Sequence, residues 1–218
     1  MTLTIDHFVL ACADLADAER QVAAALGGPA VGHGRHDFMG THNALWRVGS
    51  AYLELIAIDP EGANPDQPRW FGLDSVNAPQ TLQQTRFIAW MAASDMLETD
   101  LAKSPWPFET PMACSRDHLS WRVCLPQGRA PLGGGAYPHM IQWDPGVTPP
   151  GQSLTDTGLG LSRFAVHAPS DTLAALTTLG AAGLVDTLRE APQTRMELTL
   201  TRPDGGTARF SSEGGLDQ

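Results

Sequence analysis

Cysteine and positive charge are both scarce in this 218-residue sequence. The three cysteines, Cys12, Cys114 and Cys124, are widely spaced and form no CxxC motif, so neither a disulfide framework nor a thiolate zinc site is expected. Lys103 is the only lysine, and the formal net charge is −10. Because no segment is basic, we expect neither nucleic acid nor an anionic membrane surface to be the main partner.

Long apolar runs and targeting signals are also missing. No apolar run approaches the roughly 18–20 residues that a transmembrane helix needs, and the first residues lack the basic and apolar regions of a signal peptide. The sequence contains neither a GxSxG elbow nor a GxGxxG phosphate loop. With 42% hydrophobic and 17% charged residues, it has the composition of a globular chain with a buried core, and we expect a soluble, cytoplasmic protein.

The chain repeats one order of elements. Residues 4–13 alternate and are rich in apolar side chains, which predicts a strand. Asp14 and Gly27 suit the two ends of a helix over 15–26. Three further strands are predicted over 29–33, 44–48 and 51–58. This segment therefore has the order βαβββ.

The same order recurs twice. The second round consists of a strand over 86–93, a helix over 96–103 and strands over 118–125 and 136–143. Ala51-Tyr52 and Asp59-Pro60 align without a gap with Ala136-Tyr137 and Asp144-Pro145, which supports a duplication. A weaker third round has strands over 161–168, 185–190, 194–201 and 207–211, with a helix from 170 to 179. The predicted organisation is a first unit (1–60), a Pro-rich connector (61–84), a second unit (85–145), a linker (146–160) and a third, weaker unit (161–218).

Four segments carry a resemblance to a known family: Asp6–Leu10, Gly34–Asn43, Tyr52–Ile56 and Ile141–Asp144. In this order they resemble the glyoxalase-like domain family of the vicinal-oxygen-chelate superfamily. The resemblance implies an α+β fold in which tandem βαβββ units form curled mixed sheets around a cup-shaped cavity. It also implies a divalent metal that holds two neighbouring oxygens of a small substrate. The superfamily contains lyases, isomerases, dioxygenases and metal-free drug-sequestering proteins, so the reaction stays open.

His7 and Glu54 are the most unusual polar residues of the predicted strands. Glu54 lies inside an otherwise apolar run, and an inward-facing His or Glu costs free energy unless it is paired. The residues alone fit either a buried His–Glu pair or a metal site, and the resemblance places both at ligand positions. His139 aligns with Glu54 in the second unit, which completes a candidate metal set of His7, Glu54 and His139 for Zn²⁺, Mn²⁺, Ni²⁺ or Fe²⁺. The expected counterpart of His7 lies near Ile88, so the usual fourth ligand is missing.

The loop over residues 32–43 is rich in histidine and glycine. Arg35 is suited to hold a carboxylate or phosphate, while His36 and His42 are candidate acid–base groups. A polar surface hairpin is the alternative. The candidate catalytic residues are Glu54, His36 and His42. The candidate substrate-binding residues are Arg35, Asn43, Trp90 and Trp121.

The sequence therefore predicts a binding site for a small molecule. The first hypothesis is a metal-dependent lyase, isomerase or dioxygenase acting on a small oxygenated substrate. The second is a metal-free protein that sequesters a ligand in a Trp-lined cup, and the third is a scaffold whose ancestral site has decayed. An odd number of units predicts a homodimer through the third unit, or a sheet edge that loops cover.

Overall fold

The first unit forms four strands and one helix in the predicted order, but the second strand lies over 32–36 rather than 29–33, and the predicted loop over 32–43 is largely the hairpin of the second and third strands. In the computed structural model, which describes residues 3–75, 78–214 and 216–217, the elements of this unit are β1 (Thr4–Ala11), α1 (Leu15–Leu26), β2 (Gly32–His36), β3 (Thr41–Val48) and β4 (Ala51–Ile58). The Asp14 side chain caps α1 by accepting a hydrogen bond from the Asp17 N–H at 2.9 Å. Gly27 ends the helix at a φ of 76°, a left-handed conformation that glycine adopts without a side-chain clash.

The second unit has the same order of elements with a shorter helix. Its elements are β5 (Arg86–Ala93), α3 (Leu97–Leu101), β6 (Met112–Arg116), β7 (Leu119–Cys124) and β8 (His139–Trp143). The helix is shorter than the predicted 96–103, and it begins after Met96 without a side-chain cap. The described residues also contain short helical segments of three or four residues: η1 (Trp70–Gly72), α2 (Ala78–Thr81), η2 (Leu132–Gly135), α4 (Pro150–Ser153) and η3 (Ala182–Leu184).

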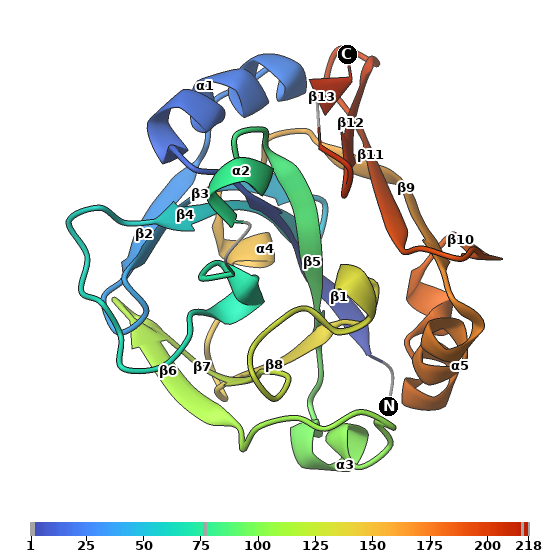
Figure 1. The fold of residues 1–218 in the computed structure, drawn as a ribbon. Coiled ribbons are helices and arrows are strands. Elements are labelled where there is room, and N and C mark those ends of the chain that lie inside the picture. Colours follow the sequence, from blue (N-terminus) through green and yellow to red (C-terminus); the bar gives the residue numbers. More distant parts are fainter. Residues whose placement is uncertain (1–2, 76–77, 215, 218) are drawn as a thin grey trace.

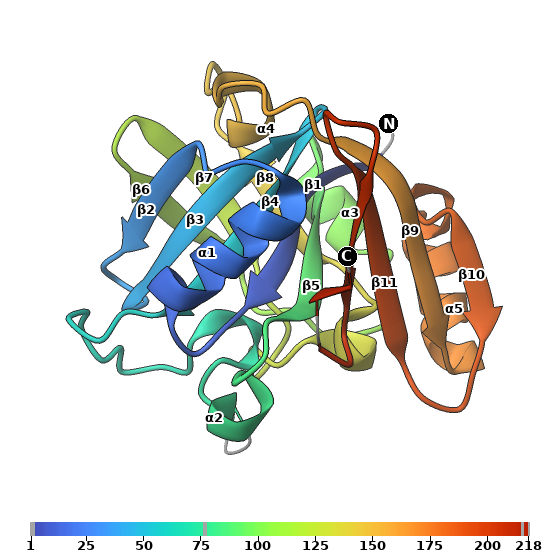
Figure 2. The ribbon, with the colours of Figure 1, turned by 90° about the horizontal axis from the view of Figure 1, so that it is seen from above.

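The two units share one eight-stranded mixed sheet, in the order β2-β3-β4-β1-β5-β8-β7-β6. Within each unit the first strand pairs in parallel with the last, so β1 pairs with β4 and β5 with β8. The antiparallel pair β1–β5 joins the units. The sheet curls until its edge strands β2 and β6 approach each other, as Figures 1 and 2 show. The predicted α+β class with curled mixed sheets is confirmed.

The third segment forms a second sheet with a different topology. Its elements are β9 (Gly160–Ala168), α5 (Ser170–Leu179), β10 (Thr187–Glu190), β11 (Arg195–Thr201), β12 (Thr207–Ser211) and β13 (Leu216–Asp217). The strand order is β10-β9-β11-β12-β13, and β9 pairs in parallel with β10. β9 thus pairs in parallel with β10, the first strand after helix α5. In the first two units, the first strand instead pairs in parallel with the last strand. The order of elements is the predicted one, but the pairing differs.

Each face of the eight-stranded sheet has its own apolar core. The outer face packs against α1 and the second sheet, with Phe8, Trp90 and Phe164 at its centre. The inner face, which the curled sheet encloses, carries Met91 and Ile141. The connector, drawn in turquoise in Figure 1, crosses this inner side and adds its own apolar side chains to the core there. The connector is therefore part of the inner core as well as a link between units.

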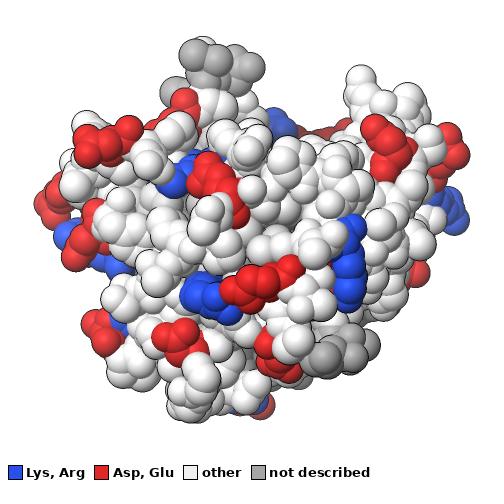
Figure 3. Space-filling model, turned by 90° about the horizontal axis from the view of Figure 1, so that it is seen from below, with Lys and Arg blue, Asp and Glu red and all other residues white. Residues whose placement is uncertain are grey.

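The surface agrees with the charge pattern of the sequence. On the face seen in Figure 3, acidic and basic side chains are interspersed, without a large area of one sign. None of the helices in the described part of the chain is long and apolar enough to cross a bilayer.

Candidate functional site

A small cavity lies on the inner face of the curled sheet. Its volume is about 40 Å³, which leaves room for only a few water molecules. Both units and the connector contribute to its wall. The polar residues of the wall are His7, His36, Asn43, Tyr52, Glu54 and Arg116, and the aromatic ones are Trp70, Phe71, Trp121 and Trp143.

His7 and Glu54 form the centre of the cavity wall. His7 is on β1 and Glu54 on β4, where the parallel register places Glu54 beside Val9 on the same face as His7. The His7 Nε2 lies 3.5 Å from Glu54 Oε2, and the residues are 5% and 6% exposed. The ring of Tyr52 stacks on His7, with 4.4 Å between ring centroids. The residues alone left a buried His–Glu pair and a metal site as alternatives, and the structure contains a His–Glu contact.

Asp6 also contacts His7, because β1 contains a bulge. Ile5 pairs with Ala92 and His7 with Met91, so the register skips Asp6. The bulge changes the direction of the Asp6 side chain, whose Oδ1 lies 2.6 Å from His7 Nδ1. Asp6 could not be predicted as a site residue, because regular strand alternation places the neighbour of an inward-facing residue on the opposite face.

The two carboxylates keep His7 positively charged. Burial alone would lower its pKa, but hydrogen bonds to Asp6 and Glu54 outweigh burial and raise the pKa of His7 to about 9. Burial would likewise raise the pKa of Glu54, and the contact with His7 instead lowers it to about 2. At neutral pH the cavity therefore contains an imidazolium next to a carboxylate.

A second group of polar residues joins the edges of the sheet. Asn43 donates from Nδ2 to Glu54 Oε1 at 2.5 Å, and its Oδ1 accepts from Arg116 Nη1 at 3.4 Å. Arg116 Nη1 also donates to His36 Nε2 at 3.2 Å. Because arginine can only donate, His36 Nε2 accepts and its Nδ1–H faces Thr41 Oγ1 at 3.2 Å. Burial, assisted by the nearby cations, lowers the pKa of His36 to about 4, so this ring is neutral.

Arg116 fits into the site because Gly34 has no side chain. A Cβ at position 34 would lie 2.1 Å from Arg116 Nη1, so no larger residue fits without moving the guanidinium. Within the described residues Arg116 has no carboxylate partner, and its buried Nε has no hydrogen-bond acceptor. The indole Nε1 of Trp70 is also buried without a partner. Two residues of the cavity wall, Arg116 and Trp70, thus each have a buried hydrogen-bond donor without an acceptor.

Arg116 could not be identified from the sequence, because it lies at the end of an edge strand, next to the β6–β7 turn. An arginine at such a position is usually solvated. The space that the missing side chain of Gly34 leaves is filled by the guanidinium of the chain's own Arg116.

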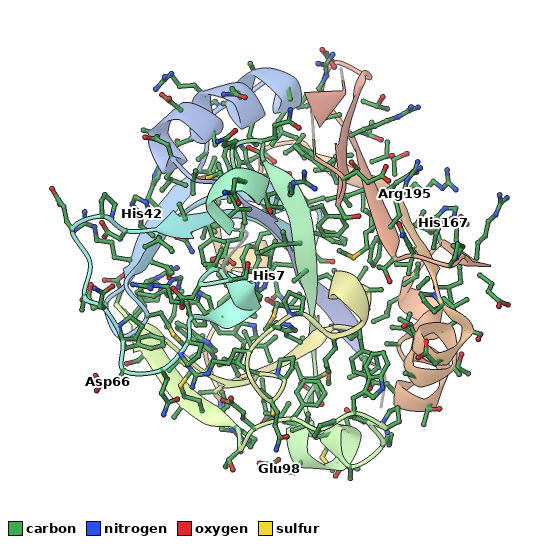
Figure 4. The ribbon with its side chains drawn as sticks, viewed as in Figure 1. His7, His42, Asp66, Glu98, His167 and Arg195 are labelled. Carbon is green, nitrogen blue, oxygen red and sulfur yellow. The ribbon has the colours of Figure 1, made fainter. Side chains whose placement is uncertain are left out.

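Several predicted site residues lie outside the cavity. Arg35 is exposed and pairs with Asp59 and Glu61, each at 3.2 Å. His42 alternates with Asn43 along β3 and therefore faces away; Figure 4 shows it toward the periphery, while His7 lies in the middle of the molecule. Trp90 is on the outer face, fully buried, and donates from Nε1 to the Ala136 carbonyl at 2.8 Å. Of the remaining candidates, His36, Asn43, Glu54 and Trp121 line the cavity.

The three predicted metal ligands do not form one set. His139 is fully buried on β8, stacked on Phe71 at 5.0 Å between centroids, and both ring nitrogens lack a hydrogen-bond partner. Among the residues that the structure describes, no group of three His, Cys, Asp or Glu side chains could hold a metal ion. On β5, Met91 is the register partner of His7, where the sequence predicted a residue near Ile88, and Ile88 also packs against the inner core. The residues present thus do not fit a centre with three protein ligands.

Comparison with protein families identifies the fold family. A family model described as a glyoxalase-like domain matches residues 5–181. The chain belongs to the glyoxalase-like domain family. The resemblance of the four sequence segments to this family is therefore confirmed. No curated protein has a sequence that matches the chain.

Solved structures with a similar fold come from several bacteria. A hypothetical protein from Staphylococcus aureus is 13% identical, with a TM-score of 0.62 over 96% of this chain and 99% of that chain. Methylmalonyl-CoA epimerase from Mycobacterium tuberculosis is 20% identical, with a TM-score of 0.44 over 66% of this chain and 89% of that chain. A mutant 4-hydroxymandelate synthase from Streptomyces coelicolor is 14% identical, with a TM-score of 0.48 over 96% of this chain and 62% of that chain. At these identities only the fold is comparable.

Proposed function

We propose that this glyoxalase-like protein is an enzyme that binds a small, anionic, oxygenated molecule and transfers a proton on it. The observation that carries the proposal is the pair of unused donors, Arg116 Nε and Trp70 Nε1, beside the His7–Glu54 pair. A buried donor without an acceptor costs about 1–3 kcal/mol. Carboxylate and carbonyl oxygens are the acceptors that a guanidinium and an indole N–H would bind.

The opposite charges of His7 and Glu54 suit a proton transfer that passes through an oxyanion intermediate. The C–H bond next to a substrate carbonyl would break, with its proton going to Glu54 and its electron pair to the carbonyl oxygen. His7, protonated at neutral pH, would donate a hydrogen bond to that oxygen, and return of the proton from Glu54 completes the cycle. Glu54 is a weak base alone, but an anionic ligand at Arg116 would raise its pKa through like-charge repulsion.

His36 and Asn43 would act as positioning residues. Both hold the Arg116 guanidinium, and Asn43 also holds Glu54. The metal-dependent enzyme predicted from the sequence needs three ligands close together, and no three His, Cys, Asp or Glu side chains among the described residues are placed in this way. No step of the proposed reaction is therefore assigned to a metal.

Ligand binding without chemistry is the second candidate function. The aromatic walls formed by Trp70, Trp121 and Trp143 favour it, because flat apolar rings bury a ligand well and carry no reactive group. In a sequestering protein, removing the Glu54 charge would leave ligand affinity largely unchanged. In the proposed enzyme, it would abolish turnover.

Deuterium exchange tests the enzyme directly. The protein is incubated with 2-oxobutyrate in D₂O, and loss of the C3 proton signal is followed by NMR. We expect exchange above the buffer rate for the wild type and a rate at least about a hundredfold lower for Glu54→Gln, the size of a lost acid–base group. His42→Gln, on the same sheet but outside the cavity, is the matched control and should exchange like the wild type. Equal rates in the wild type and Glu54→Gln would contradict the proposal.

A further inference from the structure

Phe71 lines both the cavity beside His7 and a second, larger hollow. The second hollow, which we call the apolar groove, has a volume of about 280 Å³. Its wall is mainly apolar, with Leu73, Leu82, Phe87, Ile88 and Pro131, and Arg86 and Ser212 also line it. The cavity beside His7, at about 40 Å³, leaves no room for a long aliphatic tail, whereas the groove is several times larger.

The backbone that carries Phe71 is held on both sides. Phe71 itself has a φ of 58°, a left-handed conformation that costs a non-glycine residue roughly 1–2 kcal/mol. Before it, Arg69 bonds through its N–H and its guanidinium to Asp74, both at 2.6 Å. After it, the Gly72 N–H donates to the Arg129 carbonyl at 3.1 Å. Opening would therefore come from rotation of the Phe71 side chain, which is buried and stacked on His139, rather than from movement of the loop.

His139 lies against the ring of Phe71. It is fully buried, and neither ring nitrogen has a hydrogen-bond partner. On β8 it shares the inner face with Ile141 and Trp143, which line the cavity. Rotation of Phe71 away from its stack would let a polar group of a bound ligand reach His139 and remove the cost of leaving it unpaired.

We propose that Phe71 is a gate, and that the ligand is an acid with an oxygenated head and an aliphatic tail. This inference rests on the proposed function for the head, which Arg116 and Trp70 would hold. With Phe71 rotated, the cavity and the groove become one site, and the tail extends along the groove. His139 then faces the middle of the ligand. The apolar wall of the groove favours an unbranched, uncharged tail over a polar one.

A chain-length series tests the gate. Dissociation constants are measured by tryptophan fluorescence for 2-oxobutyrate, 2-oxohexanoate, 2-oxooctanoate and 2-oxodecanoate. Each added methylene should tighten binding by about threefold to fourfold while it enters the groove. Ala130→Trp, at an exposed position on the groove wall, should abolish this dependence and leave 2-oxobutyrate binding unchanged. Ala16→Trp, at an exposed position on α1, is the matched control and should keep the full dependence.

Phe71→Gly tests the gate without blocking the groove. Glycine tolerates the left-handed backbone, so the loop should keep its conformation while the aromatic side chain between the cavity and the groove is removed. We expect 2-oxodecanoate to associate about tenfold faster than with the wild type, with chain-length dependence retained. An unchanged association rate would contradict a gate at this residue.

The outcomes separate the inference from the proposed function. If 2-oxobutyrate binds and exchanges but longer acids bind no better, the gate is wrong and the proposed function stands. If no oxo acid binds at any length while 1-decanol binds in the wild type and fails in Ala130→Trp, the acidic head is wrong, and the proposed function fails with it. Chain-length dependence that Ala130→Trp leaves intact would place the tail elsewhere and overturn the inference.

Discussion

His7 illustrates how single contacts decide the chemistry of this site. A buried histidine alone would lose its charge, yet contact with Asp6 and Glu54 keeps it protonated. His36, only a short distance away along the same wall, lacks a contacting carboxylate and is neutral. The two histidines of the cavity thus differ in charge, His7 being positive and His36 neutral, because only His7 contacts carboxylates.

The raised pKa of His7 predicts a loss of stability at alkaline pH. Because the pKa of His7 in the folded chain, about 9, lies above the ordinary 6.5, its stabilising effect is complete below pH 6.5 and is lost as pH rises through 9. The free energy of unfolding in urea, measured at intervals over this range, should fall in the wild type more steeply than in His7→Gln. Parallel curves for the two proteins would show that His7 is not an imidazolium in the folded state.

At the residue scale the sequence allowed part of the site to be predicted. Glu54 and His7 were identifiable because a charged residue in an apolar strand needs a partner. Asp6 and Arg116 were not, since one depends on a bulge and the other on a contact between distant strands. Trp90 was placed on the wrong face, because apolar residues occupy both faces of β5 and leave no alternation to follow.

At the element scale, the contact of β2 with β6 completes the cavity. These strands are the two edges of the eight-stranded sheet, and the guanidinium of Arg116 packs on Gly34 where they meet. Periodicity predicted the strands themselves, since each buries a regular set of side chains. It could not predict that the connector would fill the inner face, because a Pro-rich segment has no period to reveal which side chains are buried.

Gly34→Ala tests the edge contact. The added methyl group would displace the Arg116 guanidinium, and 2-oxobutyrate should bind at least about tenfold more weakly, a loss of roughly 1.4 kcal/mol. The control is Gly28→Ala, where a Cβ meets nothing within 4 Å. Isothermal titration calorimetry gives the affinities, and wild-type affinity in Gly34→Ala would contradict the role assigned to Arg116.

At the scale of the whole molecule, the second sheet supports the first. Phe164 on β9 packs edge-on against Phe8 and Trp90, at 5.3 and 5.2 Å between centroids. These contacts support β1, the strand that carries His7, on the outer face of the sheet. The sequence predicted the elements of this third segment but not its pairing, because the same order of elements is compatible with more than one strand order.

Phe164→Ala measures this support. Loss of a fully buried phenylalanine should lower the free energy of unfolding by about 3–5 kcal/mol. Leu161→Ala, at a 40% exposed position on the same strand, should change it by less than about 0.5 kcal/mol. Equal, small effects of both substitutions in urea denaturation would show that the second sheet contributes little to the core.

The homodimer predicted from the odd number of units stays a prediction. The core face of the second sheet packs on the first sheet of its own chain, so a dimer would use the outer face or an edge strand. Light scattering coupled to gel filtration decides the question. A mass twice that of the 23.3 kDa chain would support the dimer, and the mass of one chain would exclude it.

Anion binding by Arg116 is the central claim, and one comparison tests it most directly. Calorimetric titration with 2-oxobutyrate is carried out on the wild type, on Arg116→Gln and on Arg35→Gln, whose guanidinium is exposed and already paired with carboxylates. We predict at least about tenfold weaker binding for Arg116→Gln and unchanged binding for Arg35→Gln. Wild-type affinity in Arg116→Gln would contradict the account.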